Sequence, residues 1–462
     1  MHLSVVALFL AACGAEYVHA PDLPPPPDAT PLPPAGPTWY DDVGPVIRAR
    51  CSGCHQPGAI APFSLLGLDD ARDKIGKMLV EIDAHRMPPY YADAEPDCTQ
   101  TRPWRGDPRM TTSERALLGA WLDADLPAGD PRPLPDPPKT DLVDPSLTLT
   151  GVEPFLSSGD RDQFACYLFD PQLTRTRYIT ALQVRPGLPA LIHHADLTVV
   201  SPAQAPGLIA AHGLGHPYSC GAAPGAQIHN WAPGNEPLTF PDGVAVPLRP
   251  GALIGVQYHY HPVGVGGLDA TAIDLALSDE VPRWTFVQTE FGNAATAPQL
   301  LPGDDDPPTG PAFVIPANRA DHVETQVFTV SWQLAGARFA EITPHAHMLA
   351  THIRATIDRF DGVRDCLATG RWNFDWQRTY DYGGPVEALP PLDSGDVITV
   401  TCHFDNSFTN PNMPRVLHDL NLVAPHDVSL GANTTDEMCI ANVGIVFPNP
   451  ALPVSVGRNR GR

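Results

Sequence analysis

Residues 252–261 read ALIGVQYHYH, a short run dominated by apolar, β-branched and aromatic side chains. Further runs of this composition occur after about residue 145, and turn residues separate them at short intervals. They are YITALQV (178–184), ADLTVV (195–200), ETQVFTVSW (324–332), HIRATI (352–357) and DVITVTCHF (396–404). Short strands with frequent turns predict antiparallel β-sandwiches.

Residues 39–130 have a different character. The stretches ARDKIGKMLVEIDAH (71–85) and TTSERALLGAWLDADL (111–126) space their apolar residues as helices do, and Thr111 or Thr112 is a candidate cap. Proline-rich or acidic linkers separate this part from the rest of the chain. We therefore predict a lipoprotein-type signal at 1–13, linkers at 14–38, 131–146 and 301–311, a helical domain at 39–130, β-sandwiches at 147–300 and 312–450, and a tail at 451–462.

The bulk composition fits a folded protein with about three domains. The chain has 462 residues, of which 43% are hydrophobic and 18% are charged. Its 55 prolines argue against an all-helical fold, because proline breaks helix interiors. The formal net charge of −23 argues against partners that need Lys/Arg patches, namely nucleic acids and anionic lipid surfaces.

The N-terminal segment indicates export. Residues 3–12, LSVVALFLAA, are apolar but too short to span a bilayer. They lead into Cys13 in a pattern that resembles a bacterial lipoprotein signal, although no Lys or Arg precedes them; an ordinary secretory signal is the alternative. We expect a periplasmic or outer-membrane protein whose membrane contact is a lipid on Cys13. Its cysteines then lie in an oxidising compartment.

Cys51-Ser-Gly-Cys54-His55 has the C-x-x-C-H spacing of haem c attachment. Two thiols at this spacing can form thioethers to the haem vinyl groups, and His55 can ligate the iron. A disulfide or half of a zinc site is the alternative, but a zinc site needs a second ligand pair. Met87 is the candidate sixth ligand, and a Met/His haem suits electron transfer. Other candidates for that position are Met78, Met110 and His85. The whole segment resembles a class I-like cytochrome c domain.

Four clusters of metal-binding side chains lie in the β part: His193-His194, His259, His345-Ala-His347 and Met438. Residues two apart on a strand share a face, so His345 and His347 can hold one metal. Neighbouring residues point to opposite faces, so His193 and His194 can hold one metal only where the strand is irregular. A thioether beside two histidines favours Cu(I). Two metal sites whose ligands differ in softness indicate electron storage at one site and oxygen chemistry at the other.

The order of these motifs resembles the type II copper, ascorbate-dependent monooxygenases, which include peptidylglycine α-hydroxylating monooxygenase and dopamine β-hydroxylase. The resemblance covers about residues 147–450 and implies two jelly-roll-like sandwiches with a copper on each, facing across an open cleft. It assigns an electron-transfer copper to His193, His194 and His259, and a catalytic, oxygen-activating copper to His345, His347 and Met438. His259 is preferred over His261 because the family's third histidine precedes a tyrosine, here Tyr260.

The resemblance also extends to cysteines. It implies one disulfide between Cys166 and Cys220 and another between Cys402 and Cys439. Cys98 and Cys366 remain; they either pair, tying the haem segment to the β part, or stay local or free.

The implied reaction inserts one oxygen atom of O2 into a C–H bond of a small substrate, and the other atom leaves as water. Two electrons are needed, one from each copper. An ascorbate-like reductant or a redox protein is the expected external donor, and the haem offers a route from that donor to the electron-transfer copper.

The chain departs from the amidating members at two positions. Thr343 and Asn442 stand where those enzymes have a substrate-binding arginine and a tyrosine, so a C-terminal glycine peptide is a disfavoured substrate. The residues of the aromatic segment 371–376 either line the cleft or, as we prefer, are core and turn residues. For Glu437 we prefer a solvated turn over a role in orienting ligands.

Two other functions fit parts of the sequence. A non-enzymatic periplasmic protein would use haem and copper to move or store electrons, and a surface-binding protein would carry degenerate sites. The six filled ligand positions argue against the latter. Oxygen uptake coupled to a hydroxylated product separates the enzyme from both.

Overall fold

The computed structural model describes residues 36–449, apart from Gly58, Ile60, Thr101, Lys139, Thr140, Val143, Ala190, Gly234, Pro262, Val263, Val265. The predicted signal with Cys13, nearly all of linker 14–38 and the tail 451–462 lie outside the described residues. Among the residues described, no helix is both long and apolar enough to cross a membrane.

Strands make up most of the regular structure, and the largest sheet has nine strands. Its main path runs in the order β1 (Leu147–Thr150), β11 (Ala272–Ser278), β4 (Arg177–Arg185), β8 (Val244–Leu248), β12 (Trp284–Gly292), β21 (Ile440–Pro448), β15 (Arg338–His345) and β18 (Tyr380–Asp381); β7 (Leu238–Thr239) pairs with β4. Because β12 pairs with β21 along its whole length, the sheet is continuous across the two predicted β domains.

Each half of the β part also has a four-stranded sheet of its own. One has the order β3 (Gln163–Phe169), β9 (Leu253–Tyr260), β5 (Ile192–Val200), β6 (Ala226–Trp231). The other has the order β14 (Arg319–Thr329), β19 (Val397–Asn406), β16 (Ala350–Asp358), β17 (Arg364–Arg371). Two sandwich-like halves that share the large sheet fit this arrangement, and one apolar core runs through both.

Small elements complete the β part. Two-stranded sheets pair β10 (Gly267–Asp269) with β2 (Phe155–Ser157), and β13 (Val314–Ile315) with β20 (Val428–Ser429). The helices here are α4 (Ala205–His212), α5 (Met413–Leu420) and the short turns η2 (Trp332–Leu334) and η3 (Val386–Ala388).

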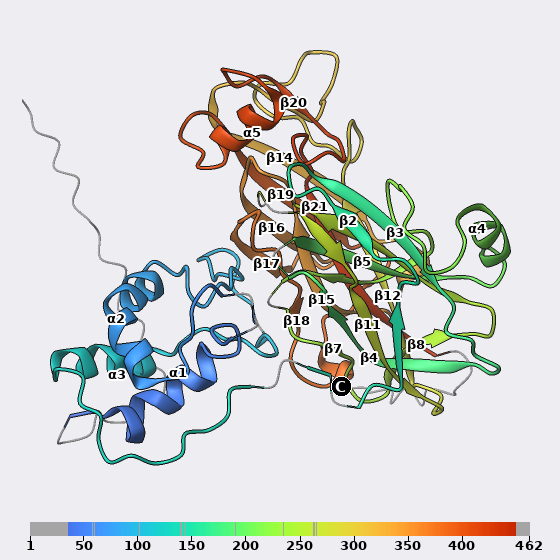
Figure 1. Ribbon diagram of the computed structural model, residues 1–462. Coiled ribbons are helices and arrows are strands. Elements are labelled where there is room, and N and C mark those ends of the chain that lie inside the picture. The colour runs from blue at the N-terminus through green and yellow to red at the C-terminus, as the bar shows by residue number, and fades with distance from the viewer. Residues whose placement is uncertain are drawn as a thin grey trace, which may run out of the picture.

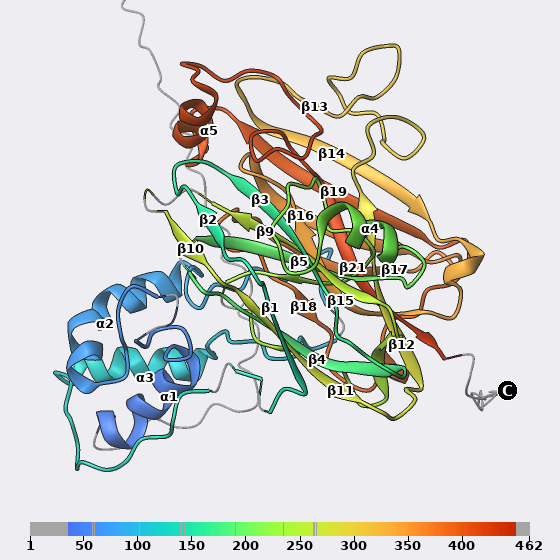
Figure 2. The same cartoon turned by 45° about the vertical axis from the view of Figure 1, so that its right-hand side comes forward.

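The helices of the N-terminal part gather on one side of the β part, as the two views show (Figures 1 and 2). They are η1 (Trp39–Val43), α1 (Gly44–Arg50), α2 (Leu68–Asp83) and α3 (Thr112–Asp123). Thr111, one of the two candidate caps, caps α3, and Glu114 completes a capping box. A small core around Trp39, Ile47 and Trp121 holds the helices together.

The predicted fold class is nevertheless wrong in its first part, because the described residues show no separate all-α cytochrome domain at 39–130. In the described part of the long connection from α2 to α3 there is no helix, and several of its residues contact the strands. Tyr90 and Ala92 belong to the core of the β part, and Trp104 forms a β-bridge with Tyr382. Helical periodicity identifies the helices, but it carries no information about these long-range contacts.

Six cysteines form three disulfides. Cys166–Cys220 and Cys402–Cys439 confirm the pairings that the resemblance implies. Cys98 pairs with Cys366 and so ties the α2–α3 connection to β17, which confirms the first alternative for these two residues. Three disulfides are typical of a protein outside the cytoplasm, in the periplasm or the extracellular space.

Candidate metal centre

An irregular strand start brings the first three histidines together. The pairing of β5 with β9 shifts register between Ile192 and His194, so His193 is the extra residue of a bulge. His194 then lies directly opposite His259 on β9. The bulge provides the irregularity that the sequence requires if His193 and His194 are to hold one metal.

The Nδ1 atoms of this histidine triad converge. His194 Nδ1 lies 3.2 Å from Nδ1 of His193 and 3.4 Å from Nδ1 of His259. The outer nitrogens are occupied, because His193 Nε2 donates to the carbonyl of Phe374 (3.0 Å) and His259 Nε2 to Asp162 Oδ1 (2.8 Å). A neutral imidazole that donates from Nε2 carries its lone pair on Nδ1. The arrangement therefore fits a three-nitrogen metal site.

Burial keeps these imidazoles neutral. It lowers the pKa of His193 and of His194 well below the usual value, and it also lowers the pKa of His259. Neutral imidazole is the form that binds metals.

His261 lies beside the triad rather than in it. Its Nδ1 is 2.7 Å from Asp162 Oδ1, the same oxygen that His259 contacts. The group of possible ligands that contains His193 and His194 includes His259, and a second group joins Asp162, His259 and His261, so the preference for His259 stays a prediction.

We expect Asp162 to orient His259, since a carboxylate behind a histidine fixes the ring and its tautomer. Replacing Asp162 by Asn should weaken metal binding at the triad by roughly 10- to 100-fold. A competition titration with a chromophoric chelator measures this. Asp170→Asn, at an exposed carboxylate just after β3, is the matched control. Equal affinities for the two variants would contradict the role of Asp162.

The second pair of histidines lies where β15 ends. The rings of His345 and His347 have centroids 5.4 Å apart. Both use Nδ1 for a hydrogen bond, His345 to Gln377 Oε1 (2.9 Å) and His347 to the carbonyl of Asp436 (3.1 Å). Each Nε2 is then the nitrogen that can bind a metal. Burial lowers the pKa of His345 to about 4 and that of His347 to about 3.

Glu437 holds Met438 next to this pair. Its buried carboxylate accepts the backbone N–H groups of His347 (2.9 Å), Leu349 (2.6 Å) and Met438 (3.1 Å). The preferred interpretation of Glu437 as a solvated turn is therefore wrong, since its exposed fraction is 0%. Burial raises its pKa to about 8, and the backbone donors act in the opposite direction. The disulfide of Cys439 fixes the next residue.

Replacing Glu437 by Gln should lower the free energy of unfolding by about 2–3 kcal/mol, because an amide nitrogen cannot accept the backbone N–H bonds. Urea unfolding of the metal-free protein measures this change. Glu387→Gln, at an exposed position in η3, should change stability by less than about 0.5 kcal/mol. A wild-type unfolding midpoint for Glu437→Gln would contradict the proposed anchoring.

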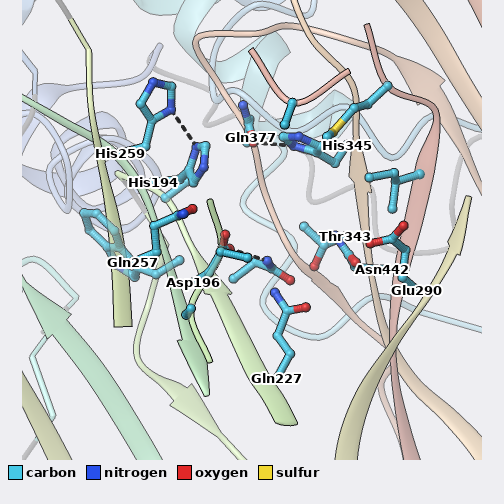
Figure 3. Close-up of a pocket in the computed structure, with 18 of the residues that line it drawn as sticks. His194, Asp196, Gln227, Gln257, His259, Glu290, Thr343, His345, Gln377 and Asn442 are labelled. Carbon is cyan, nitrogen blue, oxygen red and sulfur yellow. Dashed lines mark hydrogen bonds between the residues drawn. The ribbon is translucent and has the colours of Figure 1, made fainter. Parts of the chain in front are cut away.

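Two histidines of the triad, His194 and His259, and both histidines of the second pair line one cavity of about 450 Å3, which Met438 also lines. The rings of His194 and His345 have centroids 6.0 Å apart and meet edge to face. Figure 3 shows both rings at the same end of the cavity. The resemblance implies two coppers across an open cleft, whereas here the two histidine groups are in contact.

Two rows of polar side chains continue from the histidines into the cavity (Figure 3). One row crosses β6, β5 and β9 through Asn230, Asp196 and Gln257. The facing row crosses β12, β21 and β15 through Glu290, Asn442 and Thr343. Asp196, Gln257 and Thr343 are each two residues from a histidine, so they share its face at a distance of roughly 7 Å. A molecule held by these rows lies beside both histidine groups.

The two rows of polar side chains carry few charged groups. Burial raises the pKa of Asp196 to about 6 and also raises that of Glu290. Thr343 Oγ1 is hydrogen-bonded to Thr379. The two positions at which this chain departs from the amidating enzymes, Thr343 and Asn442, are neighbours in register and offer uncharged groups.

The C-x-x-C-H motif borders a second cavity, largely apolar and of about 430 Å3. Cys51 and Cys54 are free thiols, unlike the other six cysteines of the described part. Burial raises the pKa of Cys51 to about 12 and also raises that of Cys54, which argues against a reactive redox thiolate. His55 Nδ1 is 3.3 Å from the carbonyl of Phe63, so Nε2 can bind a metal. These groups fit a covalently attached haem.

Of the candidates for the sixth iron ligand, Met87 and Met78 line this cavity. Met87 is 41% exposed and Met78 is buried. Met110 instead packs against the small helical core. The choice of Met87 as sixth ligand therefore stays a prediction.

Sequence reasoning misses the residues that support the histidines. Asp162 precedes β3 and meets His259 only through the pairing of β3 with β9. Phe374 and Gln377 belong to a stretch without regular strands, and each contacts a different histidine group. The aromatic composition of 371–376 is the one available signal, and the preferred interpretation as core and turn residues leaves out these contacts.

Comparisons with known proteins give no family. No protein-family model matches the chain, and no curated protein matches it. The major capsid protein P2 from bacteriophage PM2 aligns with 65% of this chain and 97% of its own, at 10% identity and TM-score 0.29. PNGase F, a glycosylasparaginase from Flavobacterium meningosepticum, aligns with 66% and 96%, at 9% identity and TM-score 0.25. Likenesses at this level say nothing about the function of this chain.

Proposed function

We propose that this protein is a copper-dependent monooxygenase that inserts one oxygen atom of O2 into a C–H bond of a small molecule. One observation carries the proposal: two histidines of a three-nitrogen group, both histidines of a second pair and Met438 line one cavity. The first suits a copper that stores an electron, and the second suits a copper that cycles through Cu(I) at a soft ligand. Bound copper would supply the one-electron redox chemistry that O2 activation requires.

The residues of the chain have distinct tasks in this proposal. His193, His194 and His259 would bind one copper, and His345, His347 and Met438 the other. Asp162, Gln377 and the carbonyls of Phe374 and Asp436 orient the imidazoles by hydrogen bonds. The polar rows would hold the substrate by hydrogen bonds, with its reacting carbon toward His345 and Met438.

Haem c attached to Cys51 and Cys54, with His55 as iron ligand, would receive electrons from an external reductant or redox protein. The proposal needs covalent haem in the second cavity and does not need a separate cytochrome domain. Two free thiols at the C-x-x-C-H spacing and an available imidazole nitrogen support it.

The test is a single-turnover reaction under ¹⁸O2. Protein with haem and copper is fully reduced and mixed with pooled small molecules, and the products are analysed by mass spectrometry. We expect one ¹⁸O atom in a product, dependent on copper. Complete reoxidation with ¹⁸O recovered only in water or hydrogen peroxide, for every pool, would instead identify an electron-transfer protein.

A further inference from the structure

A six-residue segment after β17, Trp372–Gln377, contacts both histidine groups; we refer to it as the linking segment. It also lines the second cavity, which Cys51, Cys54 and His55 border and which we call the cysteine cavity. On the triad side, its Phe374 is buried and stacks on His193, with ring centroids 4.5 Å apart at 23°. The carbonyl of Phe374 also accepts the hydrogen bond from His193 Nε2 (3.0 Å). Phe374 is therefore in both ring and hydrogen-bond contact with a proposed copper ligand.

The linking segment also supports the second pair. Gln377 Oε1 accepts from His345 Nδ1 (2.9 Å), and this bond is drawn in Figure 3. Trp372 Nε1 donates to the carbonyl of His347 (2.8 Å). These contacts hold the position of the linking segment against β15 and the residues that follow it.

Its Trp376 faces the other way and reaches the N-terminal part. The indole lines the cavity that Cys51, Cys54 and His55 border. Its Nε1 donates to the carbonyl of Pro89 (3.0 Å), two residues after Met87. One residue, Asp375, separates Trp376 from Phe374 in the chain. A short covalent path thus joins the wall of the cysteine cavity to the hydrogen bond at His193.

We infer that the linking segment carries single electrons from the cysteine cavity to the triad, entering at Trp376 and leaving through the Phe374 carbonyl to His193. The inference rests on the proposed function. In each step ferrous haem is oxidised to the ferric state and Cu(II) at the triad is reduced to Cu(I). One electron moves, no bond forms or breaks, and no proton is transferred. Electrons tunnel more efficiently through covalent and hydrogen bonds than through space. This favours the path along the linking segment over direct through-space transfer between the two cavities.

The experiment uses full-length protein with haem and copper, without O2 or substrate. Laser-triggered reduction delivers one electron to the haem, and haem absorbance and the Cu(II) EPR signal follow its transfer. We expect Trp376→Leu to slow haem reoxidation at least 10-fold while haem and copper contents stay unchanged. Trp376→Phe, which keeps a ring in the wall, should fall between Trp376→Leu and wild type.

Two controls make the outcome specific. Trp332→Leu removes an exposed tryptophan of η2, and its transfer rate should equal that of wild type. Phe360→Leu removes an exposed ring between β16 and β17 and should leave transfer to the triad unchanged. A wild-type rate in both Trp376 variants, or equal slowing by Trp332→Leu or Phe360→Leu, would overturn the inferred path. Absence of copper or haem from the wild-type protein would instead overturn the proposed function.

Discussion

Replacing Met438 by leucine is expected to reduce hydroxylation at least ~100-fold and to weaken Cu(I) binding at the second pair by a similar factor, because no soft ligand remains. Leucine has nearly the volume of methionine, so the fold should tolerate it. Glu437 and Cys439 hold the neighbouring backbone in both proteins, and His345 and His347 keep their hydrogen bonds.

The measurement pairs Cu(I) competition titration with substrate-dependent O2 uptake. Met413→Leu, at a buried methionine of α5, is the matched control and should leave both quantities unchanged. X-ray absorption of the reduced protein adds a direct readout, since copper–sulfur scattering should disappear only in the Met438 variant. Copper–sulfur scattering that persists there would contradict the ligand assignment.

Removing the Cys98–Cys366 disulfide by a double serine substitution should have the largest effect on stability. The cysteines are 268 residues apart, and the chain-entropy argument for so long a loop gives roughly 5 kcal/mol. The loss of structure should begin locally, around the broken disulfide. The α2–α3 connection should detach from β17, and the hydrogen bond between Trp376 and Pro89 should open.

Thermal unfolding by circular dichroism and limited proteolysis measure these effects. The double serine variant should unfold at lower temperature and be cut in the connection from α2 to α3. A double serine variant of Cys166–Cys220 is the comparison, because it lowers stability without touching that connection. Similar cleavage of the connection in both variants would contradict the anchoring role of Cys98–Cys366.

The sequence predicts local features well and long-range ones poorly. The β runs, the helix cap at Thr111 and two disulfides are correct, since they depend on short patterns or on the resemblance. The bulge at His193 satisfies a condition that strand geometry alone imposes. A separate all-α cytochrome domain is wrong, because contacts of Tyr90 and Trp104 with distant strands leave no periodic signal.

The same reasoning explains what is missed in the site. Glu437 looks like a turn residue in sequence, yet three backbone donors from two segments surround it. Asp162 and Gln377 become partners of histidines only through sheet register and loop packing. Metal-ligating residue types are visible in a sequence, whereas the groups that orient them are placed by the fold.

The most direct test of the central claim is the copper and haem content of mature protein made in a periplasm and loaded with copper. We predict two coppers and one haem per chain, with about one copper lost when His193 and His259 are both replaced by phenylalanine. One haem and no tightly bound copper would contradict the monooxygenase and leave an exported haem protein with an unrelated β part.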